Sequence, residues 1–444
     1  MKIDLTNKDL AINGGKPFRN LNKQWLDNFT TGEEEKAIAI EVIESGYLSL
    51  FEGSHTPDHP FSFEGGPYVQ KFEKEWSKYY SIKHSISINS ATSGLYAAIG
   101  ALEIGYGDEV IVSPYTMSAC ALAPLIYGAI PVFADVEIET GCLDPISIRS
   151  KISKNTKAII VVHQFGIPAN MDSIMEIAKE FSIKVIEDCA QAHNCLYKGK
   201  QVGTIGDIGV FSLNVNKTIQ TGEGGVCVTN DDELAYRLKL IRNHGEAVVG
   251  PAEYENIINI AGFNYRMTEI IAGIALVQLN KLENLNKARI EMVNHLVNKL
   301  SFFPFLKPIN SRPECKNCSC LDSYKCQPSF YVFPMRFISE KTNVTRDEFI
   351  KALNLEGVVF YQGYVKPLYL QPLYQKKLLF KHGYPFNAVE NKDLNIDFSK
   401  GLCPNTERLH YSEMIINEHI RLPNRIDDIN DIFLAIKKLT KSRI

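Results

Sequence analysis

The sequence predicts an α/β fold: a large domain built on a mostly parallel sheet, then a smaller C-terminal α/β domain. From about residue 83 to 230, short runs rich in Val and Ile alternate with segments of helical period. These runs are almost continuously apolar, which is typical of parallel strands covered by helices on both faces. A strand, helix, strand pattern begins again near residue 330 and indicates the second, smaller domain.

Seven runs are expected to form the strands of the large sheet. In chain order they are HSISINS, DEVIVSP, IPVFADV, KAIIVVHQF, KVIEDCA, IGVFSLN and GGVCVTN. Helical patterns such as TSGLYAAIGALEI and MDSIMEIAKEFS lie between several of them. The uncharged stretch 110–134 has the length of a membrane span, but Pro and Gly interrupt it at intervals that suit strand, turn, helix and strand. We therefore interpret it as buried core.

A long helix is expected over residues 267–300, where apolar residues recur at helical spacing with few breakers. This helix would carry the chain out of the large domain. After it, FYVFPMRF, TRDEFIKALNLEG and VVFYQGY predict strand, helix and strand, and IDDINDIFLAIKKL predicts a terminal helix. We place the large domain at residues 25–285 and the small one at 286–444, with residues 1–24 packing on either.

Composition limits the classes of function. The 444 residues are 45% hydrophobic and 22% charged, which is ordinary for a soluble protein. The 48 basic and 51 acidic residues give a net charge of -3 without a basic block, so we expect no nucleic-acid partner. The N-terminal residues lack the apolar core of a signal peptide, and we expect a cytoplasmic protein with no membrane contact.

Ten cysteines divide into two groups. Six are scattered singly through apolar surroundings, where a small buried hydrophobic residue is the simplest interpretation. The remaining four, in ECKNCSCLDSYKC, are Cys315, Cys318, Cys320 and Cys326. Their spacing could surround a structural zinc ion, and the alternative is an exposed loop with free or reducible thiols.

Polar residues at strand ends are the first candidates for a site, because ligands of open parallel sheets bind beyond the carboxyl ends of the strands. Asp188 ends the run KVIED, and a buried acid there needs a cation or several donors. A structural salt bridge would also satisfy it. In INSATSGL, Ser90, Thr92 and Ser93 stand where a strand becomes a helix, which suits an anion site or ordinary helix capping.

A third strand end, FSLNVNKTIQTGEGG, contains Ser212 and Lys217. A lysine there can be a surface residue, or a desolvated amine of lowered pKa that attacks a carbonyl and forms a Schiff base. An amine for an aldehyde, an acid for a pyridine nitrogen and a helix start for a phosphate are together the needs of pyridoxal phosphate. The combination predicts this cofactor, whereas each feature alone is weak.

The sequence resembles the DegT/DnrJ/StrS family of aminotransferases, which make amino sugars and aminocyclitols. The resemblance runs through AINGGKP, GGPYVQKFEKEW, NSATSGL, GYGDEVIVSPYTMSA, PVFADV, VIEDCAQAH, FSLNVNKTIQTGEGG, RNHGE, GFNYRMTEI and QLNKL. It covers most of the first 285 residues in the same order. It implies a fold-type I pyridoxal-phosphate transferase, with the architecture of aspartate aminotransferase.

The resemblance assigns roles to matching positions. Lys217 matches the lysine that forms the Schiff base and later moves a proton between the substrate Cα and the cofactor C4′. Asp188 matches the acid that pairs with the pyridine nitrogen. Gln191 matches the residue that contacts the phenolic side of the ring.

Further matching positions concern the phosphate and a second subunit. Thr92, Ser93 and Ser212 occupy the phosphate positions of the family. Asn264, and with it Arg266, matches a segment that reaches the phosphate of the neighbouring subunit, so the resemblance implies a homodimer with shared active sites.

The sequence departs from the family where an aromatic residue commonly stacks on the pyridine ring, because Met117 stands there. Three explanations remain: Met117 stacks through its thioether, Tyr115 substitutes for it, or the ring packs more loosely. His163 and His193 also lie near strand ends, where we expect structural roles or roles in supporting the site.

The expected reaction is transamination in two half-reactions. By resemblance, L-glutamate or L-glutamine is the donor, and the acceptor is a keto-sugar, nucleotide-linked in the first instance, or a keto-cyclitol. A sugar dehydratase of the same fold is a rival hypothesis, but there a histidine replaces the lysine, so Lys217 argues against it. A non-catalytic regulatory protein with a retained cofactor site is a second rival hypothesis, and a decarboxylase or lyase of the same cofactor class is a third.

Two segments are candidates for binding the acceptor. Residues 49–66 are rich in His, Asp, Glu and aromatic side chains, which suits a hydroxyl-bearing ligand or a mobile surface loop. Within residues 365–375, Tyr369 and Tyr374 either line the pocket or pack the small domain.

Overall fold

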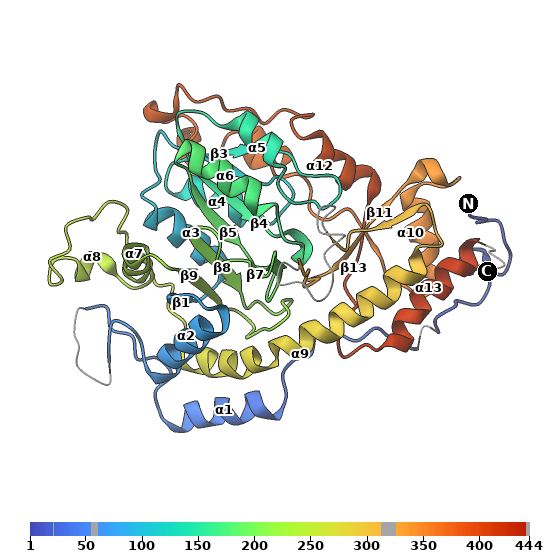
Figure 1. Ribbon diagram of the computed structural model, residues 1–444, viewed down its shortest axis with the longest axis horizontal. Helices are drawn as coiled ribbons and strands as arrows, with labels where there is room; N and C mark the ends of the chain where they lie inside the picture. The colour runs from blue at the N-terminus through green and yellow to red at the C-terminus, as the bar shows by residue number, and fades with distance from the viewer. Residues whose placement is uncertain (21, 55–60, 312–325, 441–444) are drawn as a thin grey trace.

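A computed structural model describes residues 1–444 except 21, 55–60, 312–325 and 441–444 (Figure 1). Its central element is a sheet with strand order β1-β9-β8-β5-β4-β2-β3. The strands are β1 (His84–Ile88), β2 (Glu109–Val112), β3 (Ile130–Phe133), β4 (Thr156–Val162), β5 (Lys184–Asp188), β8 (Ile208–Ser212) and β9 (Gly225–Thr229). All seven predicted runs form strands, and every pairing is parallel except those of β9 with β1 and β8.

Helices cover both faces of this sheet, as the continuous apolar strands predict (Figure 1). They are α2 (Pro67–Tyr80), α3 (Ala91–Ala101), α4 (Ala119–Ile126), α5 (Pro145–Lys151), α6 (Met171–Phe181) and α7 (Asp232–Arg242), and the short α8 (Gly245–Val248) lies beyond α7. Polar residues set their starts: the side chains of Ser90, Asn170 and Asp231 each accept a backbone N–H of the first turn. The uncharged stretch 110–134 forms β2, α4 and β3 of this domain and is not a membrane span.

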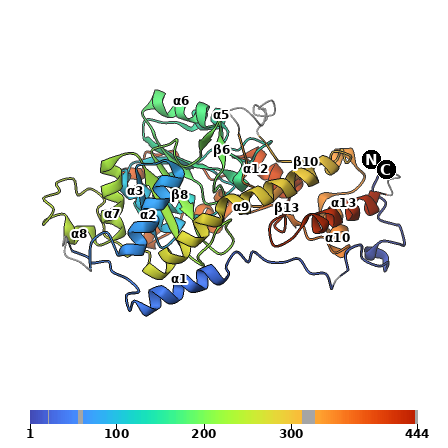
Figure 2. The same ribbon diagram turned by 60° about the horizontal axis from the view of Figure 1, so that its bottom comes forward.

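The predicted long helix is α9 (Glu269–Leu300), which runs from the large sheet to a second, four-stranded sheet. In Figure 2 its first half lies beside α2 and α1 (Glu33–Glu44). Because α9 continues unbroken through residue 285, that residue marks no break in the backbone. The division of the chain at 285 stays a prediction.

The second sheet has strand order β10-β11-β13-β12 and is antiparallel throughout. Its strands are β10 (Leu306–Pro308), β11 (Phe333–Phe337), β12 (Tyr361–Gln362) and β13 (Met414–Asn417). The helices that accompany it are α10 (Arg346–Leu355) and the terminal α13 (Ile426–Thr440). N-terminal residues also pack here, since the Asp4 N–H donates to the Leu439 carbonyl and the Arg19 N–H to the Glu356 carbonyl.

Segment 368–403, which includes α11 (Pro372–Gln375) and precedes α12 (Pro404–Arg408), packs against the large sheet instead. Tyr369 and Tyr374 are buried, and the rings of both contact Phe133 at the end of β3. They are absent from the lining of the cavity described below, which corrects one expected role, and they pack residues 368–403 against the large sheet rather than against the small sheet.

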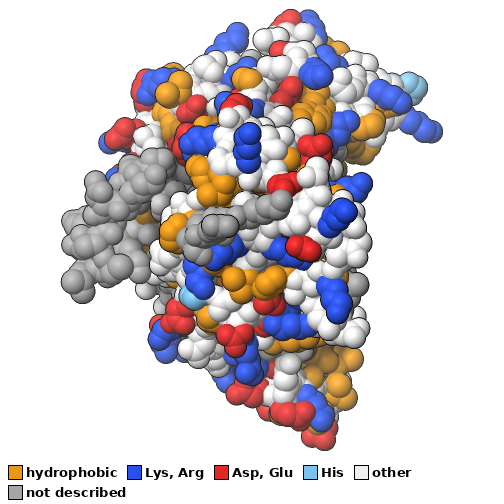
Figure 3. All heavy atoms as spheres, turned by 90° about the vertical axis from the view of Figure 1, so that its right-hand side faces the viewer, with side chains coloured by type: hydrophobic (Ala, Val, Ile, Leu, Met, Phe, Trp, Pro, Cys, Tyr) orange, Lys and Arg blue, Asp and Glu red, His pale blue; other side chains and the backbone are white. Residues whose placement is uncertain are grey.

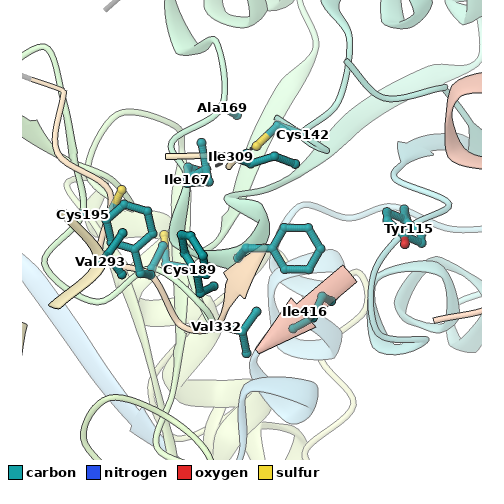
Figure 4. Close-up of a cluster of buried hydrophobic side chains, with 14 of the residues drawn as sticks. Tyr115, Cys142, Ile167, Ala169, Cys189, Cys195, Val293, Ile309, Val332 and Ile416 are labelled. Atoms are coloured by element: carbon teal, nitrogen blue, oxygen red, sulfur yellow. Dashed lines mark hydrogen bonds between the residues drawn. The ribbon is translucent and has the colours of Figure 1, made fainter. Parts of the chain in front are cut away.

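A continuous core joins the two sheets. In Figure 4, Val293 of α9, Val332 and Ile416 from the second sheet region lie among Ile167 and Cys189 from loops of the large sheet. The six singly placed cysteines are buried, as predicted: Cys120, Cys142, Cys189, Cys195, Cys227 and Cys403. The loops at the carboxyl ends of β5 and β8 are thus held against the small sheet.

Candidate active site

A cavity of about 370 Å³ opens at the carboxyl ends of the strands of the large sheet. Leu95, Tyr96 and Leu122 give it an apolar wall, and Asn214 and Glu223 contribute polar groups. Five predicted site residues line it: Thr92, Met117, Asp188, Ser212 and Lys217. The strand-end reasoning therefore brought together residues from four separate segments.

Lys217 lies on the loop between β8 and β9, with its side chain half-buried. Its Nζ is 4.3 Å from the centre of the Tyr331 ring. Burial lowers the pKa of the amine to about 8, although the charge of Asp188 acts in the opposite direction. Asn28 of the N-terminal segment fixes the loop, because its amide donates to the Lys217 carbonyl (2.8 Å).

Two glycines shape this loop. Gly222 has φ +81, a left-handed conformation that allows the chain to turn back toward β9. At Gly225 a Cβ would lie 2.8 Å from the Ala91 nitrogen and 2.8 Å from the Phe211 oxygen. Only a glycine lets β9 approach the start of α3 this closely, and this approach brings the lysine loop beside that helix.

Asp188 ends β5 and is 6% exposed. Its Oδ1 accepts the Ala190 N–H (3.0 Å), and its Oδ2 accepts the thiol of buried Cys120 (3.0 Å). Burial, together with this carboxylate, raises the pKa of Cys120 well above its ordinary value, so the thiol stays protonated and acts as a donor. One hydrogen bond to each oxygen fixes the plane of the acid at the cavity wall.

The start of α3 forms the anion end of the cavity. The hydroxyl of Ser90 caps the helix by accepting the Ser93 N–H (3.1 Å), and the Ser93 hydroxyl donates to Asn89 Oδ1 (2.7 Å). Ser93 is absent from the cavity lining and its hydroxyl is bound to Asn89, whereas Thr92 is exposed there and Ser212 faces the cavity from β8. The first amides of α3 and these two hydroxyls suit a phosphate.

Gln191 lies behind the cavity wall. Its Oε1 accepts the Phe165 N–H (2.7 Å), and its amide donates to the Tyr364 hydroxyl (3.2 Å). It is 4% exposed and is absent from the cavity lining. The predicted contact with the phenolic side of a cofactor ring stays a prediction.

The structure distinguishes between two explanations for the missing aromatic residue. Met117 lines the cavity and is 55% exposed. Tyr115 is completely buried, with its ring against Phe165, Tyr364 and His410, and it does not line the cavity. The explanation that Tyr115 takes the place of the stacking aromatic residue is therefore wrong, and Met117 is the side chain that could cover a bound ring.

Asn264 and Arg266 lie outside the cavity. Asn264 is exposed, and its carbonyl accepts the Asn89 amide (3.2 Å). Arg266 donates to Asn243 Oδ1 (2.8 Å), and burial with the nearby Arg242 lowers its pKa. Neither lines the cavity of its own chain, and their role toward a neighbouring subunit stays a prediction.

The two histidines are buried and structural in their contacts. His163 Nε2 lies 3.0 Å from Glu187 Oε2, and its Nδ1 accepts the Ala169 N–H. Burial, and then the charge of Lys217, lowers the pKa of His193 to about 3, so its ring is neutral.

Two predicted features fall wholly or partly outside the described residues. Cys315, Cys318 and Cys320 lie outside them, and Cys326 is disulfide-bonded, so nothing supports a zinc site. Residues 55–60 of the segment 49–66 also lie outside them, and its role in binding the acceptor stays a prediction.

Sequence reasoning missed three contacts of the site: Tyr331 under the lysine, Cys120 on the acid and Asn28 behind the loop. Cys120 carried a usable signal, because it lies three residues beyond Met117 at the start of a predicted helix. Tyr331 and Asn28 lie far from Lys217 in the chain, and no local pattern marks them.

A primary amine of lowered pKa, a buried acid and a helix start, grouped around one cavity on an α/β sheet, define a pyridoxal-phosphate enzyme. The described residues fit this cofactor. Lys217 would hold it covalently, Asp188 would pair with its pyridine nitrogen, and Thr92 and Ser212 would bind its phosphate at α3.

Comparisons with known proteins agree. The model of the DegT/DnrJ/EryC1/StrS aminotransferase family matches residues 58–390. GDP-perosamine synthase of Caulobacter vibrioides is 36% identical over 308 residues, which are 68% of this chain and 79% of that protein. Spore coat polysaccharide biosynthesis protein SpsC of Bacillus subtilis is 29% identical over 92% of this chain and 95% of its own.

Solved structures show the same likeness. An aminotransferase of Psychrobacter cryohalolentis has a TM-score of 0.75 at 27% identity, covering 94% of this chain and 98% of its own. DesV of S. venezuelae has a TM-score of 0.73 at 26% identity, covering 93% and 95%. The chain belongs to the DegT/DnrJ/EryC1/StrS family of pyridoxal-phosphate-dependent aminotransferases.

Proposed function

We propose that this aminotransferase moves the amino group of L-glutamate or L-glutamine to a keto-sugar, with a nucleotide-linked sugar as the first candidate and a keto-cyclitol as the alternative. The observation that most strongly supports transamination is the lowered pKa of Lys217, an amine in a cavity that Asp188 also lines. Support for a sugar comes from the relative named for GDP-perosamine and from the one named for spore coat polysaccharide.

The chain's residues would divide the work. The cofactor supplies an electron sink that stabilises negative charge at the carbon bearing the transferred nitrogen. Lys217 would hold the cofactor covalently, and its free Nζ would take the proton from the donor's α carbon. Asp188, fixed by the Cys120 thiol and the Ala190 amide, would keep the pyridine nitrogen protonated.

A homodimer with shared sites is part of the proposal. Arg266 is half-buried beside the cation Arg242, and its one described hydrogen bond goes to a neutral amide. A phosphate held by the other subunit would neutralise this charge.

The surface is consistent with small-molecule substrates. On the face in Figure 3, acidic and basic side chains are interspersed without a large patch of one sign. In the described part of the chain, every helix is too short or too polar to span a bilayer.

The test is spectroscopic. Purified protein should absorb as a pyridoxal-phosphate enzyme, and L-glutamate or L-glutamine alone should convert it to the pyridoxamine form. One keto-sugar of a test panel should then restore the starting spectrum. Lys217→Ala should abolish borohydride trapping of the cofactor; trapping at another lysine, or no cofactor after reconstitution, would refute the proposal.

A further inference from the structure

Two buried arginines beside the Lys217 loop have no acidic partner among the described residues. Arg289 of α9 is 3% exposed, and Arg421, between β13 and α13, is 9% exposed. Arg289 Nη1 donates to the Thr218 hydroxyl (2.9 Å) and the Phe330 carbonyl (3.2 Å), both neutral acceptors. The Nε of each arginine is buried without a hydrogen-bond partner. Neither charge is therefore neutralised by an ion pair within the described residues.

Comparable buried arginines of this protein are paired. Arg242 contacts Glu73 at 2.7 Å, and Arg336 contacts Glu413 at 2.6 Å. Within the part of the chain that the structure describes, no carboxylate lies within 4.0 Å of either unpaired arginine. Exposed Glu418 and Asp27 act on Arg421 only from farther away.

The electrostatics of the pair agree with this geometry. Burial, and then the charge of Arg421, lowers the pKa of Arg289 to about 9. Burial also lowers the pKa of Arg421. A buried cation is costly unless an anion pairs with it, so two adjacent ones without an acid indicate a place for a bound anion.

Tyr331 places this pair beside the reacting amine. Lys217 Nζ lies 4.3 Å from its ring centre, and the preceding residue, Phe330, accepts a hydrogen bond from Arg289. The charges of both arginines act on the Tyr331 hydroxyl. Arg289 also adjoins the lysine loop directly, through Thr218.

We propose that Arg421 and Arg289 bind the α-carboxylate of the amino-acid donor on the Tyr331 side of Lys217. The donor's nitrogen must reach the position of Lys217 Nζ, and its carboxylate is attached to the same carbon as that nitrogen. A guanidinium binds a carboxylate with two parallel hydrogen bonds. The cofactor phosphate is a less suitable anion, because Thr92 and Ser212 would hold it at the start of α3.

The inference rests on the proposed transamination, and its test separates the two. Arg421→Gln should raise the half-saturating L-glutamate concentration about 10- to 100-fold, the loss expected for hydrogen bonds to a charged group. Arg421→Lys should fall between it and the wild type. Arg425→Gln, which changes an exposed arginine of the same loop, is the matched control and should have no effect. Borohydride trapping at Lys217 should persist in all three.

Two further measurements do not need turnover. Calorimetry with glutarate should show binding to the wild type and the Arg425 variant, and none to Arg421→Gln. The melting temperature of Arg421→Gln should equal or exceed that of the wild type, because the change removes an unpaired buried charge, whereas a merely structural arginine would lower it.

Several results would overturn the site. The first is equal glutarate binding by the wild type and Arg421→Gln. The second is a lower melting temperature of Arg421→Gln with glutarate binding retained. The third is that Arg421→Gln loses binding of inorganic phosphate but still binds glutarate. If the wild type holds its cofactor and binds glutarate but transfers no amino group, the proposed function fails and the carboxylate site stands.

Discussion

Lys217 should lose its proton far more readily than an ordinary lysine. Burial lowers its pKa from 10.5 to about 8, a change worth about 3 kcal/mol. At pH 7, about a tenth of an amine with this pKa is neutral, against about 0.03% of an amine at the ordinary value. The neutral, nucleophilic fraction should therefore be about 300-fold larger than for ordinary lysine.

Two substitutions should lower this pKa further. Asp188→Asn removes a negative charge that favours the ammonium form. Tyr331→Leu removes the ring 4.3 Å from Nζ, and a cation–π contact of about 0.5–2 kcal/mol corresponds to about 0.4–1.5 pKa units.

The assay is competitive acetylation of the cofactor-free protein with labelled acetic anhydride, read out by peptide mass spectrometry. The labelling of Lys217 should rise with a midpoint near pH 8 in the wild type and at lower pH in both variants. Exposed Lys78 serves as the internal control. A wild-type midpoint near 10.5, or an upward shift in either variant, would refute the account of a desolvated amine.

Three further predictions concern the supports of the site. Cys120→Ala should weaken cofactor binding about tenfold in an absorbance titration, while Cys120→Ser, which keeps a donor to Asp188, should not; equal losses would contradict this. Gly225→Ala should lower the free energy of urea unfolding by about 3 kcal/mol, because its Cβ would lie 2.8 Å from two backbone atoms; wild-type stability would contradict the close approach. Burial opposes ionisation of Glu187, but the hydrogen bonds from His163 and backbone amides lower its pKa below 4.5. Its stabilisation is therefore present above pH 4.5 and lost as pH falls through the folded-state pKa, and Glu187→Gln should flatten acid unfolding there.

The large sheet could be predicted because each of its parallel strands is a local apolar run, so burial on both faces is visible within a few residues. The direction of β9 and the strand order could not be predicted, since long-range pairing determines them. The position of segment 368–403 could not be predicted either, because long-range packing determines it. Its aromatic side chains suit either sheet, and only the fold brings them to Phe133 on β3.

The site divides in a similar way. Thr92, Asp188 and Lys217 each follow a predicted element, and the topology of a parallel sheet collects such ends at one edge. Ser93 was predicted for the phosphate, but its N–H donates to the capping hydroxyl of Ser90 and its own hydroxyl donates to Asn89, a competition that the sequence left open. Tyr331 reaches the amine from the segment that precedes β11, and neither charge nor periodicity marks it.

The same burial that keeps Lys217 reactive leaves Arg289 and Arg421 without solvent or a counter-ion among the described residues. An acidic side chain beside them would stabilise the free protein, but it would also occupy the place of a carboxylate ligand and raise the pKa of the nearby amine. Unpaired arginines avoid both effects at a cost in stability, which a bound carboxylate would offset. A ligand at about 100 times its dissociation constant stabilises the folded state by about 2.7 kcal/mol. Saturating glutarate should therefore raise the melting temperature of the wild type and leave that of Arg421→Gln unchanged, and equal shifts in both would show that the anion binds elsewhere.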